Sequence, residues 1–533
     1  MTRFHFSFAL GPFALVIGFS SFWFSDTIAD PDLWGHIRFG QDVLRTGSIV
    51  QADIYSYRTG NQLWINHEWL SEVIFAALYD LGGPAGLIGF KVLVSVLLLG
   101  LSYAHLRRGG LEPYCAAALL LLISIPFRLG LGTIRPQIFT YLFFLFELLL
   151  LKRAEWFGAH WLWMLPVLFG IWVNLHGGVL AGVGVLGVWS AVRLVARQRD
   201  DASRPVRRLR LFLHLVLIGL ACALALCLNP YGAGLVSFLL RTATVPRPEI
   251  REWLPLSLMS LPGQLYLLLL VIGIAGLVGS RRRPTPESIL IFSVTALLPL
   301  VSNRHYPLFA LALVVMGGEH IADAWNHWRR PSGNHRGRGG WTATVNVFGS
   351  LVLVALSFPR FSCIRVEPFY FAFPARAVAL LKQSGLSGNM AVPFDWGEYV
   401  LWHLGPRVKV SIDGRRETIY SDEAYQRSRD FERGTGVWDS LLKTTTTDLV
   451  LAQNGSPTAN LMSRSDGWVP LYQDKFCLIF ARAALPSLAQ IVDQPIPALP
   501  DNGNGLCFPA PARADSAFSV SEIRRSLLPS RSR

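Results

Sequence analysis

The chain has 533 residues, of which 52% are hydrophobic, 12% aromatic and only 16% charged, and its mean hydropathy is +0.38. A soluble globular protein carries roughly 25% charged residues, so this composition excludes an ordinary soluble enzyme and predicts a polytopic membrane protein with a sizeable polar part. The net charge of +14 comes largely from short basic clusters between apolar runs. Because that pattern is typical of membrane topology, we exclude nucleic-acid binding.

Apolar runs near the length that a bilayer requires recur through the first two thirds of the chain. We predict about eleven spans, at Phe4–Phe24, Ala85–His105, Pro113–Phe127, Pro136–Leu151, Trp161–Val173, Val179–Val195, Leu209–Leu228, Pro262–Gly279, Glu287–Val301, Pro307–Ala322 and Trp341–Phe358. The segment Trp69–Gly83 is short and carries Glu72 and Asp80. We therefore expect it to lie in the membrane interface and not to cross.

Basic loops between the spans predict the orientation. They lie at residues 107–108, 152–153, 193–210, 281–283 and 329–338. With the N-terminus inside and about eleven crossings, all of them face the cytoplasm, as the positive-inside bias requires. We therefore expect a multi-pass protein of the bacterial inner membrane with a cytoplasmic N-terminus. The same parity places the loop at residues 25–68 and everything after Phe358 outside the cytoplasm.

The first external loop carries the most distinctive cluster of the chain. In the run DPDLWGH, Asp30 and Asp32 stand beside Trp34 and His36. The positive-inside bias concerns Lys and Arg and does not explain acidic groups. One interpretation is a solvated loop between two helices. The interpretation that we favour is a membrane-surface active site, in which a carboxylate does acid–base work and His36 orients Asp32 through a hydrogen bond.

Further along this loop, His67 and Glu68 add groups that can bind a substrate. Together with Asp32 and His36 they have ligand chemistry for a divalent metal, but their spacing matches no specific metal signature. We therefore predict no definite cofactor and leave a divalent metal open.

The other external turns carry single, chemically distinct side chains, whereas the cytoplasmic loops carry bulk positive charge. The polar residues of these turns are Arg135, Gln137, Asn174, His176, Arg304 and His305. Arg135 and Arg304 could bind a lipid phosphate with His176 or His305 assisting, or could be arginines that snorkel harmlessly to the interface. Asn174 and His176 could line a cavity, or could cap a helix end and permit close packing.

The pattern changes after the last predicted span. We predict a transmembrane domain at residues 1–359, an extracytoplasmic α/β domain at residues 360–485 and a loosely ordered Pro/Ala/Ser-rich tail at residues 486–533. NMAVPF, VKVSI, TDLVLAQ and KFCLIFA read as strands, and helices are expected around residues 396–403, 422–431 and 437–443. A Cys363–Cys477 disulfide would be compatible with an extracytoplasmic domain. Asp413-Gly414-Arg415 is either a ligand-binding strand end or a local turn.

These motifs together resemble a group of bacterial and archaeal GT-C-type membrane glycosyltransferase-like proteins. The resemblance is carried by D-x-D-L-W-x-H at Asp30–His36, by HEWLSE at His67–Glu72, and by the RPQ, NLHGG, NPYG, NRHYPLFAL, WGEY and DGR segments. The chain is similar more distantly to protein mannosyltransferases and lipid A aminoarabinose transferases. The resemblance implies a GT-C-type helical bundle and an acidic pair in the first external loop, one member of which acts on the acceptor. Carried over to this sequence, Asp32 is the first candidate and Asp30 the second, although Pro31 separates acids that are adjacent in those enzymes.

We therefore expect an integral membrane glycosyltransferase that transfers a sugar from a polyprenyl-phosphate-linked donor to an unidentified acceptor on the extracytoplasmic face. The expected catalytic residues are Asp32, Asp30 and His36. The expected substrate-binding residues are His67, Glu68, Arg135, Gln137, Asn174, His176, Arg304 and His305. The alternative is a non-catalytic GT-C-like protein that binds a lipid-linked glycan or assists envelope assembly.

Overall fold

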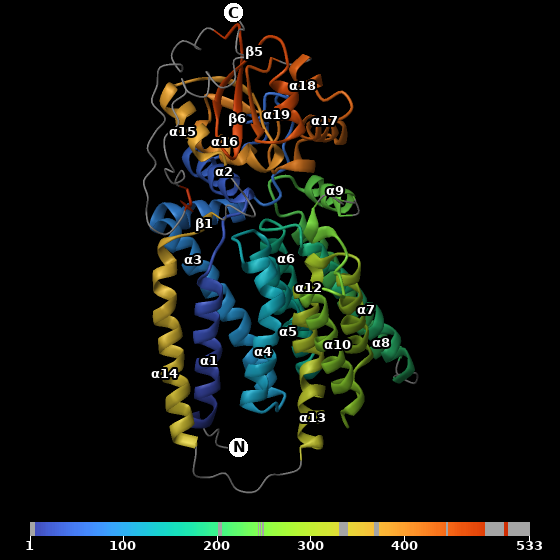
Figure 1. Cartoon of the computed structure of the whole chain (residues 1–533). Coiled ribbons are helices and arrows are strands. Elements are labelled where there is room, and N and C mark those ends of the chain that lie inside the picture. The colour runs from blue at the N-terminus through green and yellow to red at the C-terminus, as the bar shows by residue number, and fades with distance from the viewer. Residues whose placement is uncertain are drawn as a thin grey trace, which may run out of the picture. The chain divides into compact units, whose positions relative to one another are not determined.

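The computed structural model describes residues 6–200, 205–243, 245, 247, 250–329, 339–366, 373–443, 446–485 and 506–509. The chain divides into two compact units (Figure 1). Unit 1 combines residues 1–27 with residues 85–362, and unit 2 combines residues 28–84 with residues 363–533. The expected tail at residues 486–533 lies almost wholly outside the described residues, apart from residues 506–509.

Unit 1 is a bundle of helices. Its α-helices are α1 (Phe6–Ser25), the second half of α3 (Trp69–Arg108), α4 (Pro113–Leu131), α5 (Gln137–Phe157), α6 (Leu165–Trp172), α7 (Val179–Asp200), α8 (Pro205–Leu226), α9 (Ala233–Thr242), α10 (Leu261–Gly279), α11 (Pro286–Leu297), α12 (Tyr306–Ala312), α13 (Gly318–Trp328) and α14 (Gly339–Ser357). Shorter helical turns join them, of which η2 (Arg251–Trp253) and η4 (Asn303–His305) matter for the site. Prolines occur in the first turn of α4, α6, α8, α10, α11 and α12. Proline is well suited to a helix start, because it lacks a backbone N–H and the N–H groups of the first turn have no hydrogen-bond partner within the helix.

Small residues let these helices approach closely. α1 runs along α14 (Figure 1), and a Cβ on Gly18 would lie 2.7 Å from the Cα atom of Ser350. In the same way, a Cβ on Gly276 of α10 would lie 3.0 Å from the Cα atom of Ile321 in α13. Helices in a membrane gain little from hydrophobic exclusion of water, so such close backbone packing is a main source of their association.

The helices of unit 1 are long and apolar enough for an integral membrane protein. Among the described residues, six helical segments satisfy the length and hydropathy expected of a span, and five shorter apolar helices accompany them. About eleven crossings therefore remain a prediction. The segment Trp69–Gly83 is merged with the next span into α3, but Gly83 interrupts the helix with φ 56° and ψ −144°. A positive φ of this kind favours glycine, so the chain changes direction where the predicted interfacial segment ends.

Unit 2 contains an α/β sheet. Within the described residues the strand order is β3-β2-β4-β6-β5, where β2 pairs in parallel with β3 and β4, and β6 pairs antiparallel with β4 and β5. The strands are β2 (Gly388–Ala391), β3 (Val408–Val410), β4 (Leu449–Gln453), β5 (Trp468–Gln473) and β6 (Cys477–Arg482). Around them lie α15 (Ala375–Ser384), η7 (Phe394–Trp396), α16 (Gly397–Leu404), η8 (Arg416–Thr418), α17 (Asp422–Arg433), α18 (Ser440–Lys443) and α19 (Pro457–Met462). The predicted strands and helices of this region are confirmed, and β5 was not predicted.

The loop that the sequence predicts to be the first external loop is part of this unit. The backbone of Tyr55 and Tyr57 exchanges hydrogen bonds with Val410, so this stretch extends the sheet beyond β3. The loop also contains α2 (Asp32–Thr46), which was expected as an irregular polar stretch and packs against α16. The predicted domain boundaries kept residues 25–68 with the membrane bundle, whereas residues 28–84 form one compact unit with the C-terminal sheet.

The structure contains a disulfide other than the one that the sequence left open. Cys363 is bonded to Cys507, and these cysteines lie beside and within the two-stranded antiparallel sheet of β1 (Arg365–Val366) and β7 (Leu506–Cys507). Cys477 is instead a free, buried thiol in β6. The Cys363–Cys477 pair, which the sequence left open, therefore does not form, and Cys477 is enclosed in the core sheet.

Candidate functional site

Asp30 and Asp32 have different roles at the start of α2. Asp30 is buried, and its Oδ1 atom accepts a hydrogen bond of 3.0 Å from the backbone N–H of Asp32. This bond satisfies one of the N–H groups that a helix start leaves without a partner. Asp32 is itself the first residue of α2, where the helix dipole favours a negative side chain. Asp30 therefore positions the helix start, and Asp32 presents the carboxylate.

The residues after Asp32 anchor α2 to the C-terminal part of unit 2. Trp34 is fully buried, and its ring lies 4.5 Å from that of Phe373, 5.2 Å from Tyr399 and 5.1 Å from Phe508, measured between centroids. Offset aromatic pairs at these separations add to the gain from burial alone. Trp34 therefore fixes the rotation of α2, and with it the placement of Asp32 two residues earlier.

A second carboxyl lies beside Asp32. Glu398, in the first turn of α16, accepts a hydrogen bond of 3.1 Å at Oε2 from the backbone N–H of Gly35. A Cβ on Gly414 would lie 2.6 Å from Asp32 Oδ1 and 2.7 Å from Glu398 Oε1. The two carboxyls therefore border the same small space. Burial, followed by the charges of Asp32 and Asp413, raises the pKa of Glu398 well above its ordinary value.

His36 faces a different carboxylate from the expected one. Its Nδ1 atom lies 3.5 Å from Glu72 Oε1, and Asn66 donates a hydrogen bond to the other oxygen of Glu72. Burial lowers the pKa of His36, but the hydrogen bond with Glu72 and the charges of Glu68, Glu72 and Asp32 raise it to about 9 overall. His36 is therefore an imidazolium at neutral pH, and its charge favours the ionised form of Asp32.

The remaining predicted residues of this loop lie close by. His67 Nε2 is 3.6 Å from Glu68 Oε1, and the backbone N–H of Glu68 donates to Asn66 Oδ1. Asn66 therefore holds both Glu68 and Glu72. Among the described side chains, no group of three or more His, Cys, Asp and Glu residues is arranged to hold a metal ion.

Arg415 of the DGR motif forms buried ion pairs with two carboxylates. Arg415 donates hydrogen bonds of 2.8 and 2.6 Å to Asp413 and one of 2.7 Å to Asp53 of the first external loop. Its guanidinium carbon also lies 4.8 Å from the centre of the Trp64 ring. Of the two interpretations offered for this motif, the side-chain bonds therefore favour a structural one for Asp413 and Arg415.

We expect Arg415→Met to destabilise unit 2 strongly. The substitution keeps an apolar stem but leaves Asp53 and Asp413 buried without their cation, and breaking such a pair costs about 3–5 kcal/mol. The melting temperature of the detergent-purified protein measures the effect. The control is Arg407→Met at an exposed arginine of the same unit. Equal melting temperatures for the two variants would show that the ion pairs of Arg415 contribute nothing to stability.

The turn η7, which precedes the helix that carries Glu398, is held by a titratable group. Glu432 of α17 accepts a hydrogen bond at Oε1 from the backbone N–H of Phe394, in the turn η7 that leads into α16. Burial raises the pKa of Glu432 to about 7, although the bond from Phe394 opposes this shift.

We therefore expect the stability of unit 2 to fall as the pH rises through neutrality. An unfolded glutamate ionises near pH 4.3, so between that value and about pH 7 the folded chain holds a proton that the unfolded chain has lost. The stabilisation from Glu432 is complete below the pKa that this group has in the unfolded chain. It is lost as the pH rises through the pKa that the group has in the folded chain, about 7. Melting temperatures at pH 5 and pH 8 should differ less in Glu432→Gln than in the wild type. If the melting temperatures at pH 5 and pH 8 differ as much in Glu432→Gln as in the wild type, Glu432 is not the source of the pH dependence.

Unit 1 carries a separate cluster of arginines. Arg135, two residues before α5, lies 3.2 Å from Glu252 in an ion pair. The neighbouring Trp253 has the guanidinium carbons of Arg247 and Arg304 at 3.9 and 4.3 Å from its ring centre. Arg135 and Arg304, which were predicted from different turns, are thus brought together by η2. Arg135 is paired with Glu252, and Arg247 and Arg304 lie over the ring of the next residue, Trp253. Arg247 was not predicted, because its loop contains no recognisable motif.

The other predicted residues of unit 1 make local bonds. Asn174 donates to the backbone carbonyls of Gly170 and Leu228, which joins the end of α6 to the chain just after α8. His176 Nδ1 accepts from the backbone N–H of Gly178 and lies 2.7 Å from Thr140 Oγ1. The predicted alternative for these two residues, helix-end capping, accounts for these bonds. Gln137 begins α5, and His305 Nδ1 lies 3.2 Å from the backbone carbonyl of Ser302.

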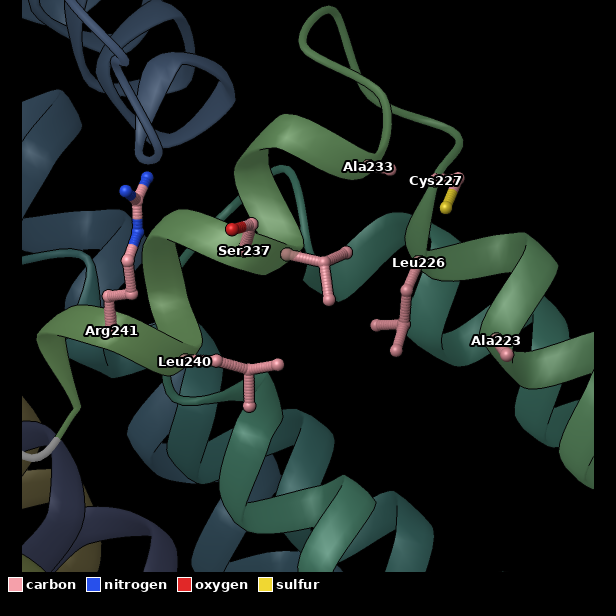
Figure 2. A pocket seen from close by; sticks show the side chains of 8 residues that line it. Ala223, Leu226, Cys227, Ala233, Ser237, Leu240 and Arg241 are labelled. Carbon is pink, nitrogen blue, oxygen red and sulfur yellow. The ribbon is translucent and has the colours of Figure 1, made fainter.

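A groove between α8 and α9 is lined by small and apolar side chains (Figure 2). Leu226 and Leu240 point into the space between the two helices, whereas the guanidinium of Arg241 extends away from them (Figure 2). The groove contains none of the predicted site residues.

Comparisons with known proteins identify the architecture. No protein-family model matches the chain, and no curated protein matches its sequence significantly. Among solved structures, ArnT from Cupriavidus metallidurans bound to undecaprenyl phosphate aligns with a TM-score of 0.52 and 14% identity, over 89% of this chain and 97% of that one. The apo form of ArnT aligns with a TM-score of 0.49 and 14% identity over the same shares of the two chains. The arabinofuranosyltransferase AftD from Mycobacteria aligns with a TM-score of 0.49 and 17% identity, over 89% of this chain and 41% of that one.

The chain has the GT-C-type fold of polytopic membrane glycosyltransferases. It is an integral membrane protein with a helical bundle and a C-terminal α/β region, as predicted from the sequence. Glu398 Oε1 and Asp32 Oδ1 border the same space at Gly414, whereas Asp30 Oδ1 accepts the backbone N–H of Asp32. The glutamate of WGEY was noted as part of a motif, but nothing in the sequence assigned it to the site.

Proposed function

We propose that the protein is a membrane glycosyltransferase that transfers a sugar from a polyprenyl-phosphate-linked donor to an acceptor hydroxyl on the extracytoplasmic side. The observation that carries the proposal is Asp32, a half-buried carboxylate fixed at the first turn of α2 by the Asp30 cap and the buried Trp34. The GT-C-type fold supports the reaction class, and ArnT, which shares that fold, was solved with undecaprenyl phosphate bound.

In the proposed reaction, Asp32 accepts the proton of the acceptor hydroxyl. The freed oxygen attacks the anomeric carbon of the sugar, and the bond between that carbon and the lipid phosphate breaks. The electron pair of the broken bond leaves with the phosphate, which departs as an anion. A carboxylate within hydrogen-bond reach is a suitable general base, and its contribution is typically about 10²–10⁴-fold in rate.

The departing phosphate needs cations, and we propose Arg135, Arg247 and Arg304 for this role. Guanidinium groups bind phosphate through charge-assisted, often bidentate hydrogen bonds. Glu252 pairs with Arg135 in the structure, so a phosphate would compete with Glu252 for that guanidinium.

Lipid extracts from cells test this proposal. A strain that lacks the gene should accumulate its polyprenyl-phosphate sugar relative to the wild type, and the wild-type gene should reverse the accumulation. Mass spectrometry of the lipid pool would identify the sugar from the species that accumulates. An unchanged pool of every lipid-linked sugar would instead favour the non-catalytic alternative, in which the protein binds a lipid-linked glycan.

The proposed orientation can be tested independently of activity. In a background with Cys115 and Cys227 replaced by Ser, we expect Glu423→Cys to react with an impermeant maleimide on intact cells, because unit 2 would face outwards. Arg108→Cys, at the basic end of α3, should react only after permeabilisation. Labelling with the opposite pattern would invert the topology and place Asp32 on the cytoplasmic side.

A further inference from the structure

Glu398 is held in one orientation by a backbone donor. The N–H of Gly35, in the first turn of α2, donates a hydrogen bond of 3.1 Å to Oε2 of Glu398. A carboxyl has two oxygens, and this bond assigns Oε2 the role of acceptor. Oε1 is left as the atom that borders, together with Asp32 Oδ1, the space at Gly414.

Two glycines make room for the carboxyls. A Cβ on Gly35 would lie 2.1 Å from Glu398 Oε2, a distance that atoms cannot adopt without a shift. A Cβ on Gly414 would lie within 2.7 Å of both Glu398 Oε1 and Asp32 Oδ1. Gly35 belongs to DLWGH, Gly414 to DGR and Glu398 to WGEY, so three separate motifs meet at this carboxyl pair.

The charges around Glu398 disfavour its ionised form. Asp32 from α2, Asp413 from the turn after β3 and Glu72 from α3 all act on it, and Arg415 is the cation that opposes them. Arg415 already binds Asp413 and Asp53, so its charge is shared with two other carboxylates. Glu398 is only 5% exposed, and water therefore does little to stabilise an additional negative charge.

We propose that Glu398 is the positioning partner of Asp32: as a neutral carboxylic acid it donates a hydrogen bond from Oε1 to Asp32 Oδ1. This bond favours the ionised form of Asp32 and aims its other oxygen away from Gly414. The pair carries one negative charge and one proton, and the proton on Glu398 stays in place while Asp32 accepts the proton of the acceptor. The inference rests on the proposed role of Asp32 as the base.

Infrared spectroscopy of the purified full-length protein tests the proton directly, without any substrate. The difference between wild type and Glu398→Gln at pH 7 should contain the C=O stretch of one protonated carboxyl. In the Asp32→Asn background the same band should titrate at lower pH, because the neighbouring negative charge that favours the proton is gone. Glu423→Gln, an exposed carboxylate in the same unit, is the matched control and should remove no band at pH 7. Absence of the Glu398 band, or a band that Asp32→Asn leaves unmoved, would overturn the proposal.

The pH profile of transfer tests the consequence for Asp32. Glu398→Gln keeps a donor in the place of Oε1, so the acid limb of kcat/KM should stay near that of the wild type. Glu398→Ala removes the donor, and the acid limb should move up by about one pH unit, because Asp32 then binds a proton more easily. A purely structural Glu398 would lower the rate equally at every pH and leave the limb unmoved, which would also overturn the proposal.

The two tests separate this inference from the proposed function. If Asp32→Asn keeps full transfer activity, Asp32 is not the base and the proposed function of this site fails, whatever the infrared result. If Asp32→Asn is inactive but neither the infrared band nor the acid limb depends on Glu398, only the partnership of Glu398 with Asp32 fails.

Discussion

Asp32→Asn should lower the transfer rate by about 10²–10⁴-fold while the protein level and the melting temperature stay close to those of the wild type. The substitution preserves the size of the side chain and removes only the group that accepts a proton. The side chain of Asp32 is not needed for the hydrogen bond at the helix start, which Asp30 accepts, nor for the core contact, which comes from Trp34. The rate with the donor identified from the lipid pool is the measurement.

Asp30→Asn provides the matched comparison. Its side chain can still accept the bond from the N–H of Asp32 through the amide oxygen, so we expect a small effect on rate. Asp30→Ala should lower the melting temperature because the cap is lost. If instead Asp30→Asn abolished transfer and Asp32→Asn did not, the roles of the two acids would be reversed.

Arg135→Gln and Arg304→Gln should each weaken binding of polyprenyl phosphate by roughly 10- to 100-fold. A hydrogen bond to a charged group contributes about 1.5–3 kcal/mol, and every 1.4 kcal/mol corresponds to a factor of ten in affinity. Lysine keeps the charge but loses the planar fork, so Arg135→Lys should weaken binding less than Arg135→Gln. Competition by polyprenyl phosphate against a labelled lipid phosphate gives the affinities.

Glu252 distinguishes phosphate binding from simple ion pairing. If Arg135 binds phosphate, Glu252→Gln removes a competitor and the affinity should stay the same or rise. If Arg135 serves only to hold Glu252, then Glu252→Gln and Arg135→Gln should have the same effect on stability and affinity. Arg282→Gln, at an exposed arginine beyond the end of α10, is the control for a general loss of charge. An affinity that none of these variants changes would remove the arginine cluster from the proposal.

The sequence predicted those parts of the fold that have a local pattern. The apolar runs predict the membrane helices, and the buried strands β4 and β6 stand out as continuous apolar segments. β5 was not predicted because WVPLYQ contains a proline and ends in a polar residue, and its pairing with β6 is irregular next to Pro470. α2 was not predicted because its charged residues were interpreted as a polar loop, although buried Leu33, Trp34 and Ile37 follow one another at helical spacing.

The site could be predicted only where one motif contains it. DPDLWGH is enough to propose Asp32, but Glu398, which accepts the N–H of Gly35, comes from a segment more than three hundred residues away in the sequence. No local rule connects Gly35 with Glu398, or Arg415 with Asp53, because these contacts arise when the first external loop joins the C-terminal sheet. The disulfide could not be assigned for the same reason, because cysteine spacing does not specify pairing. In the structure the sheet encloses Cys477.

Release of free polyprenyl phosphate by the purified protein in proteoliposomes is the most direct measurement of the central claim. The vesicles would contain the lipid-linked sugar that accumulates in the deletion strain, together with envelope material from that strain as a source of acceptor. The account predicts release of polyprenyl phosphate and loss of the donor with the wild-type protein, and neither with Asp32→Asn. Equal release by the two proteins, or none by either when bound donor can be recovered from both, would contradict it.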